Sequence, residues 1–173
     1  MNELIQLHDA MASTIKAAMP QLLKVEAAPG TPDGSVVPAV YFSISAMDHS
    51  ADPGDGRSGL KASFEARLLV DPNLARAPLQ AAILAAQLMD LLRGQYWDLD
   101  FVDGVTAMQA KPAPAPEASA LKNLWLVQWQ QVIYLGQEQW PWPNQPPGSL
   151  ALGFSPDTGL GNRDRYQSPE QME

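Results

Sequence analysis

LKASFEARLLV, residues 60–70, is the stretch of the chain that decides its fold. Apolar and polar side chains alternate along it, and a period of two predicts a strand with one buried face. Residues 39–47 (AVYFSISAM) alternate in the same way. The two strands are predicted to pair as a hairpin. Their expected inward residues are Val40, Phe42, Ile44 and Ala46 on the first strand, and Leu60, Ala62, Phe64, Ala66, Leu68 and Val70 on the second.

The connection between these strands, residues 48–59, contains three Asp and three Gly, and Ala51 is its single apolar residue. A segment with so little to bury predicts a mobile, protruding loop. Calcium binding is not expected, because an EF-hand needs alternating ligands and a closing Glu, which this loop lacks. Its charged residues are instead candidates for contacts with another protein subunit: Asp48, Asp52, Asp55 and Arg57.

Two helices are predicted on one face of the sheet. The first covers residues 2–19, where apolar residues recur every three or four positions, and Pro20 ends it. The second covers residues 75–93, with Asn73 expected to cap its start and Gly94 to end it. Its apolar residues span a wide arc, as a helix lying on a sheet requires: Leu79, Ile83, Leu84, Leu88, Leu91 and Leu92.

Three further strands complete the expected sheet. Residues 22–28 form the first, and residues 101–109 and 123–136 form a closing hairpin across the Pro/Ala-rich turn 111–120. Hairpins join antiparallel neighbours. The predicted fold class is therefore α+β, with a mostly antiparallel sheet, two helices packed on one face, and an extended C-terminal arm.

The compact domain is predicted to span residues 1–136, and residues 137–173 to form the Pro/Gly-rich arm. Trp140 and Trp142 alternate with prolines, which favour an extended backbone, and Phe154 follows further on. A solvated tail seldom carries so many large apolar groups. Two alternatives remain open: the tryptophans cover the edge of their own sheet, or they anchor the arm on another subunit.

The chain of 173 residues has a formal net charge of −8 and a sequence pI near 4.6. It lacks the positive charge that attracts phosphate backbones and anionic lipids, so neither autonomous nucleic-acid binding nor membrane binding is expected. There is no cysteine, which excludes disulfides and thiolate chemistry. The N-terminus does not read as a signal peptide, and the aliphatic stretch 81–92 is too short to span a bilayer.

No constellation of residues indicates catalysis, a metal or a cofactor. His8 and His49 are far apart in sequence, and a structural or surface role is favoured over metal ligation. Residues 153–157 (GFSPD) imitate the start of a nucleophile elbow but lack its second glycine. The three aspartates within residues 98–103 have no partner group that would raise a pKa for acid–base chemistry. The chain is therefore predicted to be a non-catalytic structural protein.

The order of these elements resembles that of the tail terminator proteins of long-tailed bacteriophages. The resemblance covers residues 2–136, from the N-terminal helix through the long-looped hairpin and the leucine-rich helix to the closing hairpin. Phrases such as FEARLLV (64–70) and WQQVIYL (129–135) are of the type found there. It implies a homo-oligomeric ring, a hexamer, at the head-proximal end of the virion tail. Such a ring caps the tail tube, stops its polymerisation and provides the head-joining surface.

The resemblance also implies the partners, namely the tail tube protein and a head–tail connector protein, with assembly in the host cytoplasm. The genome would pass through the bore without sequence-specific binding, and negative charge would keep it from adhering. The C-terminal arm exceeds the family pattern. Two alternatives therefore stay open: another neck, connector or tail component of the virion, and a monomeric host adaptor or binding module.

Overall fold

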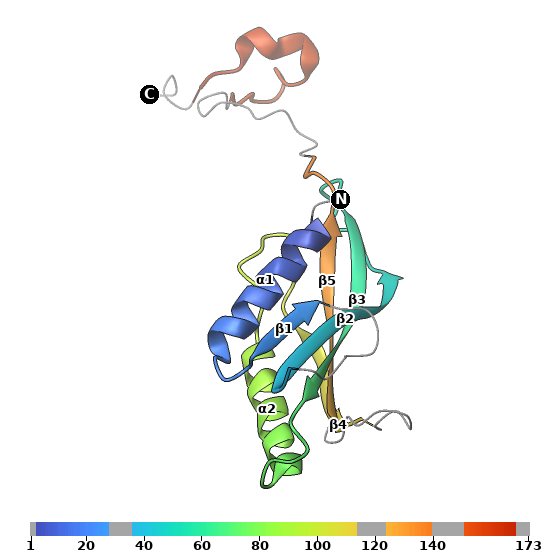
Figure 1. Ribbon diagram of the computed structural model, residues 1–173. Coiled ribbons are helices and arrows are strands. Elements are labelled where there is room, and N and C mark those ends of the chain that lie inside the picture. The colour runs from blue at the N-terminus through green and yellow to red at the C-terminus, as the bar shows by residue number, and fades with distance from the viewer. Residues whose placement is uncertain (1–2, 28–35, 114–123, 140–150, 169–173) are drawn as a thin grey trace. The chain divides into compact units, whose positions relative to one another are not determined.

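The computed structural model describes residues 3–27, 36–113, 124–139 and 151–168. The chain divides into two units, Met1–Gln139 and Trp140–Glu173, each compact in itself. The first unit holds the sheet and both α-helices (Figure 1). The domain boundary expected after Gly136, with an arm beyond it, stays a prediction.

The alternating hairpin forms the centre of a five-stranded sheet in the order β1-β2-β3-β5-β4. The strands are β1 (Lys24–Ala27), β2 (Ala39–His49), β3 (Ser58–Leu69), β4 (Thr106–Pro112) and β5 (Leu124–Leu135). Neighbouring strands are antiparallel except for β1 and β2, which are parallel. The predicted α+β class, with a mostly antiparallel sheet and two helices, is confirmed.

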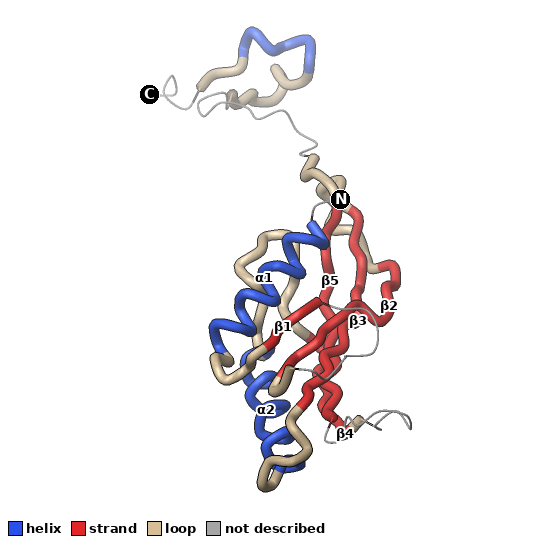
Figure 2. The backbone as a smooth tube through the Cα atoms, in the orientation of Figure 1, coloured by secondary structure: helices blue, strands red, loops and turns tan. Residues whose placement is uncertain are grey.

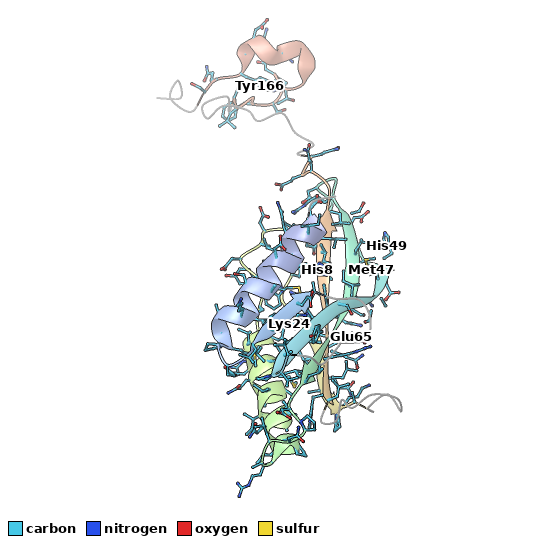
Figure 3. The ribbon with its side chains drawn as sticks, viewed as in Figure 1. His8, Lys24, Met47, His49, Glu65 and Tyr166 are labelled. Carbon is cyan, nitrogen blue, oxygen red and sulfur yellow. The ribbon has the colours of Figure 1, made fainter. Side chains whose placement is uncertain are left out.

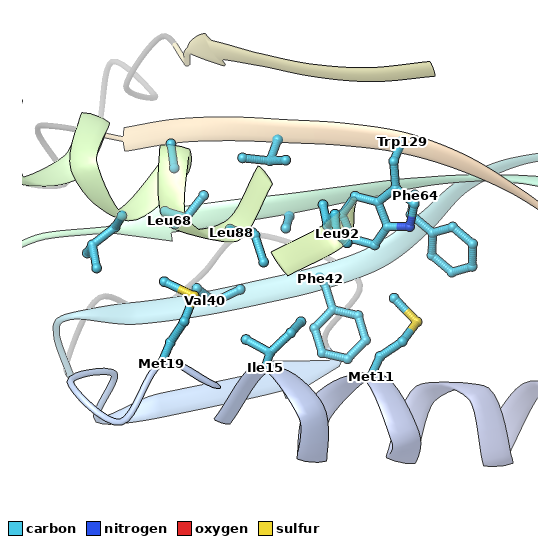
Figure 4. Packing of buried hydrophobic residues seen from close by; sticks show 14 of the residues in the cluster. Met11, Ile15, Met19, Val40, Phe42, Phe64, Leu68, Leu88, Leu92 and Trp129 are labelled. Atoms are coloured by element: carbon cyan, nitrogen blue, oxygen red, sulfur yellow. The ribbon is translucent and has the colours of Figure 1, made fainter. Parts of the chain in front are cut away.

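Both helices, α1 (Glu3–Ala18) and α2 (Ala77–Leu92), lie against the same side of the sheet (Figure 2). Their buried side chains meet the inward residues of β2, β3 and β5 in one hydrophobic core (Figure 4). Within it the rings of Phe64 and Trp129 stack, with 5.3 Å between their centroids. His8 joins this core from α1, because its ring stacks on Phe42 at 5.8 Å. The favoured structural role of His8 therefore agrees with its packing.

The inward face of β2 changes at Ser45, where a bulge interrupts the pairing with β3. Beyond the bulge Ala46 pairs with the outward residue Ser63, and Met47 pairs with the inward residue Ala62. One extra residue shifts the alternation of faces by one position. The prediction that Ala46 is buried is therefore wrong, and Ala46 is exposed. Figure 3 marks Met47 at this end of the hairpin.

The hairpin loop is shorter than expected. β2 continues to His49 and β3 begins at Ser58, so the loop covers residues 50–57 and the prediction of a loop over 48–59 is wrong at both ends. Two contacts explain the longer strands. Asp48 pairs across the strands with Lys61, which is a favourable combination of charges, and β5 supports β3 as far as Ser58.

The start of α2 also differs from the prediction. Asn73 does not cap the helix, because its backbone N and its Nδ2 both donate to the carboxylate of Asp71, at 2.9 and 3.0 Å. The helix begins three residues after Leu74, behind Arg76, which has a left-handed backbone with φ of 60° and no side-chain cap. Its end agrees with the prediction, since Gly94 has φ of +76° directly after the last turn.

The apolar arc of α2 is narrower than expected. Leu84, Leu88 and Leu92 are buried, together with alanines on the same face, whereas Leu79 and Ile83 are 53% and 48% exposed. The alanines let the helix approach the sheet closely, so the larger leucine and isoleucine side chains beside them are not needed to fill the core. Apolar surface is thus left exposed among the residues of the first unit that the structure describes.

Gln131 is a buried amide on the otherwise apolar face of β5. Its Oε1 accepts hydrogen bonds from the indole nitrogens of Trp97 and Trp129, at 2.8 and 3.3 Å. Its Nε2 donates to the backbone carbonyls of Gln95 and Asp103, at 3.2 and 2.9 Å. The single amide thus attaches the segment between α2 and β4 to the centre of the sheet.

Replacing Gln131 by leucine is expected to lower the free energy of unfolding by about 2–4 kcal/mol, because the Trp97 and Trp129 indoles and the Asp103 carbonyl lose this partner, whereas the Gln95 carbonyl keeps the hydrogen bond from the backbone N of Val105. Urea denaturation measures the change. Gln128→Leu, on the other face of the same strand, serves as the control and should change stability by no more than about 0.5 kcal/mol. Equal losses in the two variants would contradict this role of Gln131.

Candidate interaction surfaces

The hairpin loop is organised by an ion pair between two of the predicted interface residues. The Asp55 carboxylate accepts hydrogen bonds from the backbone N, the Nε and the Nη2 of Arg57, at 3.0, 2.9 and 2.6 Å. Both side chains are largely covered, with 14% and 19% exposed. The Arg57 guanidinium also lies 5.3 Å from the ring centre of Tyr134. Asp55 and Arg57 are therefore engaged within their own unit.

The other two loop candidates differ in their surroundings. The Asp52 carboxylate accepts a hydrogen bond from the backbone N of Gly59 at 2.8 Å, which closes the loop. Gly59 is required there, because a Cβ would lie 2.3 Å from the carbonyl oxygen of Ala51. Asp48 is exposed on β2. Of the four charged candidates in the hairpin, Asp48 is thus the one that takes part neither in the hydrogen bond to Gly59 nor in the Asp55–Arg57 ion pair.

The loop also binds the chain that follows β5. The backbone N of Gln139 donates to the carbonyl oxygen of Asp55. A Cβ at Gly56, where φ is +93°, would lie 2.8 Å from the Cβ of Gln139. The hairpin tip therefore fixes the point at which the chain leaves the first unit.

Tyr134 connects this tip to the segment that Gln131 holds. Its hydroxyl donates to the Asp103 carboxylate at 2.9 Å, and this hydrogen bond, with burial, raises the pKa of Tyr134. The backbone N of Asp103 donates to the carbonyl of Val132 at 2.9 Å. The aspartates at 98–103 were expected to be exposed turn acids, and Asp103 is exposed, although its carboxylate accepts this hydrogen bond. The sequence feature that could have indicated that this segment is fixed to β5 is Gln131, the one polar residue on the inward face of the last strand.

A groove opens at the other end of the sheet, beside the N-terminal half of α2. Its volume is about 370 Å³. Its apolar walls are formed by Pro38, Val70, Leu74, Ile83 and Leu84, and its amide groups come from Gln21, Gln80 and Gln87. Gln21 Nε2 donates to Gln87 Oε1 at 2.8 Å across the rim. Leu74, at 44% exposed, adds to the apolar surface that Leu79 and Ile83 leave open.

On the sheet face opposite the helices, the part around Ser63 and Glu65 is polar and nearly balanced in charge, whereas Ala39, Tyr41, Leu69 and Leu124 form a buried apolar cluster elsewhere on the same face. Gln128 and Gln130 of β5 lie beside Glu65 and Ser63 of β3, and Glu65 forms an ion pair with Arg67 at 2.8 Å. Gln130 Nε2 donates to the Ser63 hydroxyl at 3.2 Å. This part of the face therefore offers amide and hydroxyl groups rather than a strong field of one sign.

The second unit is a small closed turn over residues 151–168. Leu152 and Gln167 exchange two backbone hydrogen bonds, of 2.9 and 3.0 Å, around the 3-10 helix Leu160–Arg165. The Tyr166 hydroxyl accepts a hydrogen bond from the backbone N of Gly159 at 2.7 Å. Phe154 is 65% exposed on this turn, so it remains available for a contact. Trp140 and Trp142 lie outside the described residues.

Neither histidine is part of a metal site in the described parts of the chain, where no group of three His, Asp or Glu side chains lies close enough to hold an ion. The predicted non-catalytic character stays a prediction. Among the residues that the structure describes, no helix is long and apolar enough to cross a membrane.

No protein-family model matches this chain, and no curated protein matches it in sequence. Among the solved structures that resemble it is the sheath/tube terminator of PVC, an extracellular contractile injection system, determined by cryo-EM in the extended state. The two chains are 14% identical, with a TM-score of 0.44. The alignment covers 91% of this chain and 66% of that terminator, so this chain spans just under two thirds of its length.

The Asp55 carboxyl is expected to titrate below its ordinary value of 3.8, because the hydrogen bonds from Arg57 lower its pKa. A lowered pKa means that the pair is complete above pH 3.8 and is lost as the pH falls through the lower folded-state value. An NMR titration that follows the Arg57 amide measures the midpoint. Arg57→Gln, read through the same residue's amide, should move the midpoint up towards 3.8, and the exposed control Arg93→Gln should not. A wild-type midpoint at or above 3.8 would contradict the pairing.

Proposed function

We propose that this chain is a tail terminator, which forms a ring on the end of a tail tube, stops its polymerisation and presents a surface for joining the head. The observation that carries the proposal is the exposed apolar surface formed by Leu79 and Ile83 of α2 and by Leu74, which precedes the helix. Exposed apolar patches on a well-packed domain mark contact sites for other proteins. The order of the elements, which resembles that of phage tail terminators, supplies the kind of assembly.

The described surfaces suit a ring better than a symmetric dimer. The apolar groove lies beside Val70, after the last residue of β3, whereas the loop and the chain exit lie beside Ser58, at the first residue of β3. Two different surfaces at opposite ends of one domain favour head-to-tail contacts, which close into rings or continue into filaments. A hexamer is the ring size that the family resemblance implies.

The proposed bore would carry DNA without binding it. A net charge of −8 repels phosphate, and the part of the sheet face around Ser63 and Gln130 offers amide and hydroxyl groups, with Glu65 and Arg67 paired beside it. A second candidate is another component of the neck between head and tail. The closed turn of the second unit favours it, because the Phe154 side chain is 65% exposed there.

Deletion of the gene is expected to give tails of uncontrolled length, or tails that fail to join heads, because nothing then stops the polymerisation of the tail tube. Electron microscopy of the particles measures tail length and head attachment. Restoring the wild-type gene is the control. Tails of normal length that carry heads would end the terminator proposal, and normal tails without heads would favour the neck component.

Truncation after Gln139 is expected to leave a folded domain that no longer associates. The domain folds because the cut keeps the hydrogen bond from Gln139 to Asp55, and association is lost because the cut removes Trp140 and Trp142. A buried tryptophan at an interface is worth roughly 2–4 kcal/mol. Circular dichroism reports the fold and sedimentation velocity reports the association. A truncated chain that unfolds would show that the tryptophans cover their own sheet. A truncated chain that assembles normally would show that they have no part in the contact.

A further inference from the structure

We infer that the groove beside α2 receives the Trp140–Pro143 segment of a neighbouring copy of this chain. This deepens the proposed function, on which it rests, by naming the joint between subunits. The groove is apolar on its walls and carries three glutamines. That combination suits an indole ring, which needs apolar contact for its body and a hydrogen-bond acceptor for its N–H.

The size of the groove also fits this occupant. At about 370 Å³ it lies near the lower end of the usual range for small-ligand pockets, roughly 300–1,000 Å³. It is therefore a place for one or two large side chains and not for a whole helix. Prolines follow both tryptophans in the sequence WPWP (140–143), and a stiff segment loses less entropy when it binds.

The same copy cannot supply the occupant, because the chain is too short to reach. β5 runs from Leu124, which pairs with Leu69 beside the groove, to Leu135, which pairs with Ser58 beside the loop. At roughly 3.3 Å per residue these two ends are about 36 Å apart. Gln139 is held beyond the far end by its hydrogen bond to Asp55. Trp142 follows it by three residues, which span at most roughly 10 Å.

If the Trp140–Pro143 segment fills this groove, it must therefore come from another copy. Each copy then contributes one tryptophan segment and one groove, at opposite ends of the same sheet. Such a joint is heterologous, so every pair keeps one unused segment and one unused groove, and growth ends only when a ring closes.

The test uses the full-length chain and three variants. Ile83→Glu places a charge in the groove, and Trp140→Ala with Trp142→Ala removes the proposed occupant. Ile5→Glu is the matched control, because Ile5 is also a helical isoleucine, is 60% exposed, and lies on α1 outside the groove. Thermal melting should give the same midpoint for the groove variant and the control, since both residues are exposed.

In sedimentation velocity, the groove variant and the tryptophan variant are each expected to associate at least about tenfold more weakly than the wild type, and the control to associate as the wild type does. An equimolar mixture of the two defective variants should form pairs, because one intact segment then meets one intact groove. A mixture that stays monomeric, or a groove variant that assembles normally, would overturn the inference.

A peptide of residues 137–148 (QEQWPWPNQPPG) gives a second readout that does not depend on assembly. It should bind the tryptophan variant, and binding should fall at least about tenfold when Ile83→Glu is added to that variant. Equal binding of the peptide to the tryptophan variant with and without Ile83→Glu would overturn the proposed joint. The terminator proposal would not be affected, because the tail lengths after gene deletion test it separately. Normal tails after gene deletion, together with normal peptide binding, would overturn the terminator proposal and keep the joint.

Discussion

The buried amide of Gln131 is the interaction on which the rest of the first unit depends. It holds two tryptophan indoles and the backbone of Gln95 and Asp103 with a single side chain. Trp97 has a left-handed backbone with φ of 60°, which a non-glycine residue adopts only when its surroundings compensate. With Asp103 held at this point, its carboxylate meets Tyr134. The core and the hairpin tip are thus connected through one residue.

The hairpin tip depends on this connection in turn. Tyr134 presents its ring to the Arg57 guanidinium, Arg57 holds Asp55, and the carbonyl of Asp55 holds Gln139. Each contact is local, but together they run from the centre of the sheet to the chain exit. The loop was expected to be mobile on its composition. That expectation rested only on the scarcity of apolar side chains. The loop is instead organised by an ion pair, a cation–π contact and backbone hydrogen bonds, which such a count does not include.

Sequence periodicity predicted most of the sheet and both helices, because alternation and helical spacing report directly which side chains are buried. It missed the bulge at Ser45, since an added residue leaves no mark in composition and only shifts the faces. It also placed Leu79 and Ile83 against the sheet. Periodicity counts a hydrophobic residue on a helix as core whether or not a neighbour covers it, and in α2 alanines take part of the buried face. The groove was therefore not foreseen.

The covalent length of the chain limits how copies of this protein can join. The groove and the chain exit lie at opposite ends of β5, and no local rearrangement of three residues closes about 36 Å. A groove that Trp140–Pro143 of the same copy cannot reach stays open to that segment of another copy. In the proposed joint, the apolar groove and the aromatic segment are complementary features of one contact, which gives the exposed Leu74 and Ile83 a partner. The proposed self-association thus rests on the geometry of one strand and not on any excess of hydrophobic residues.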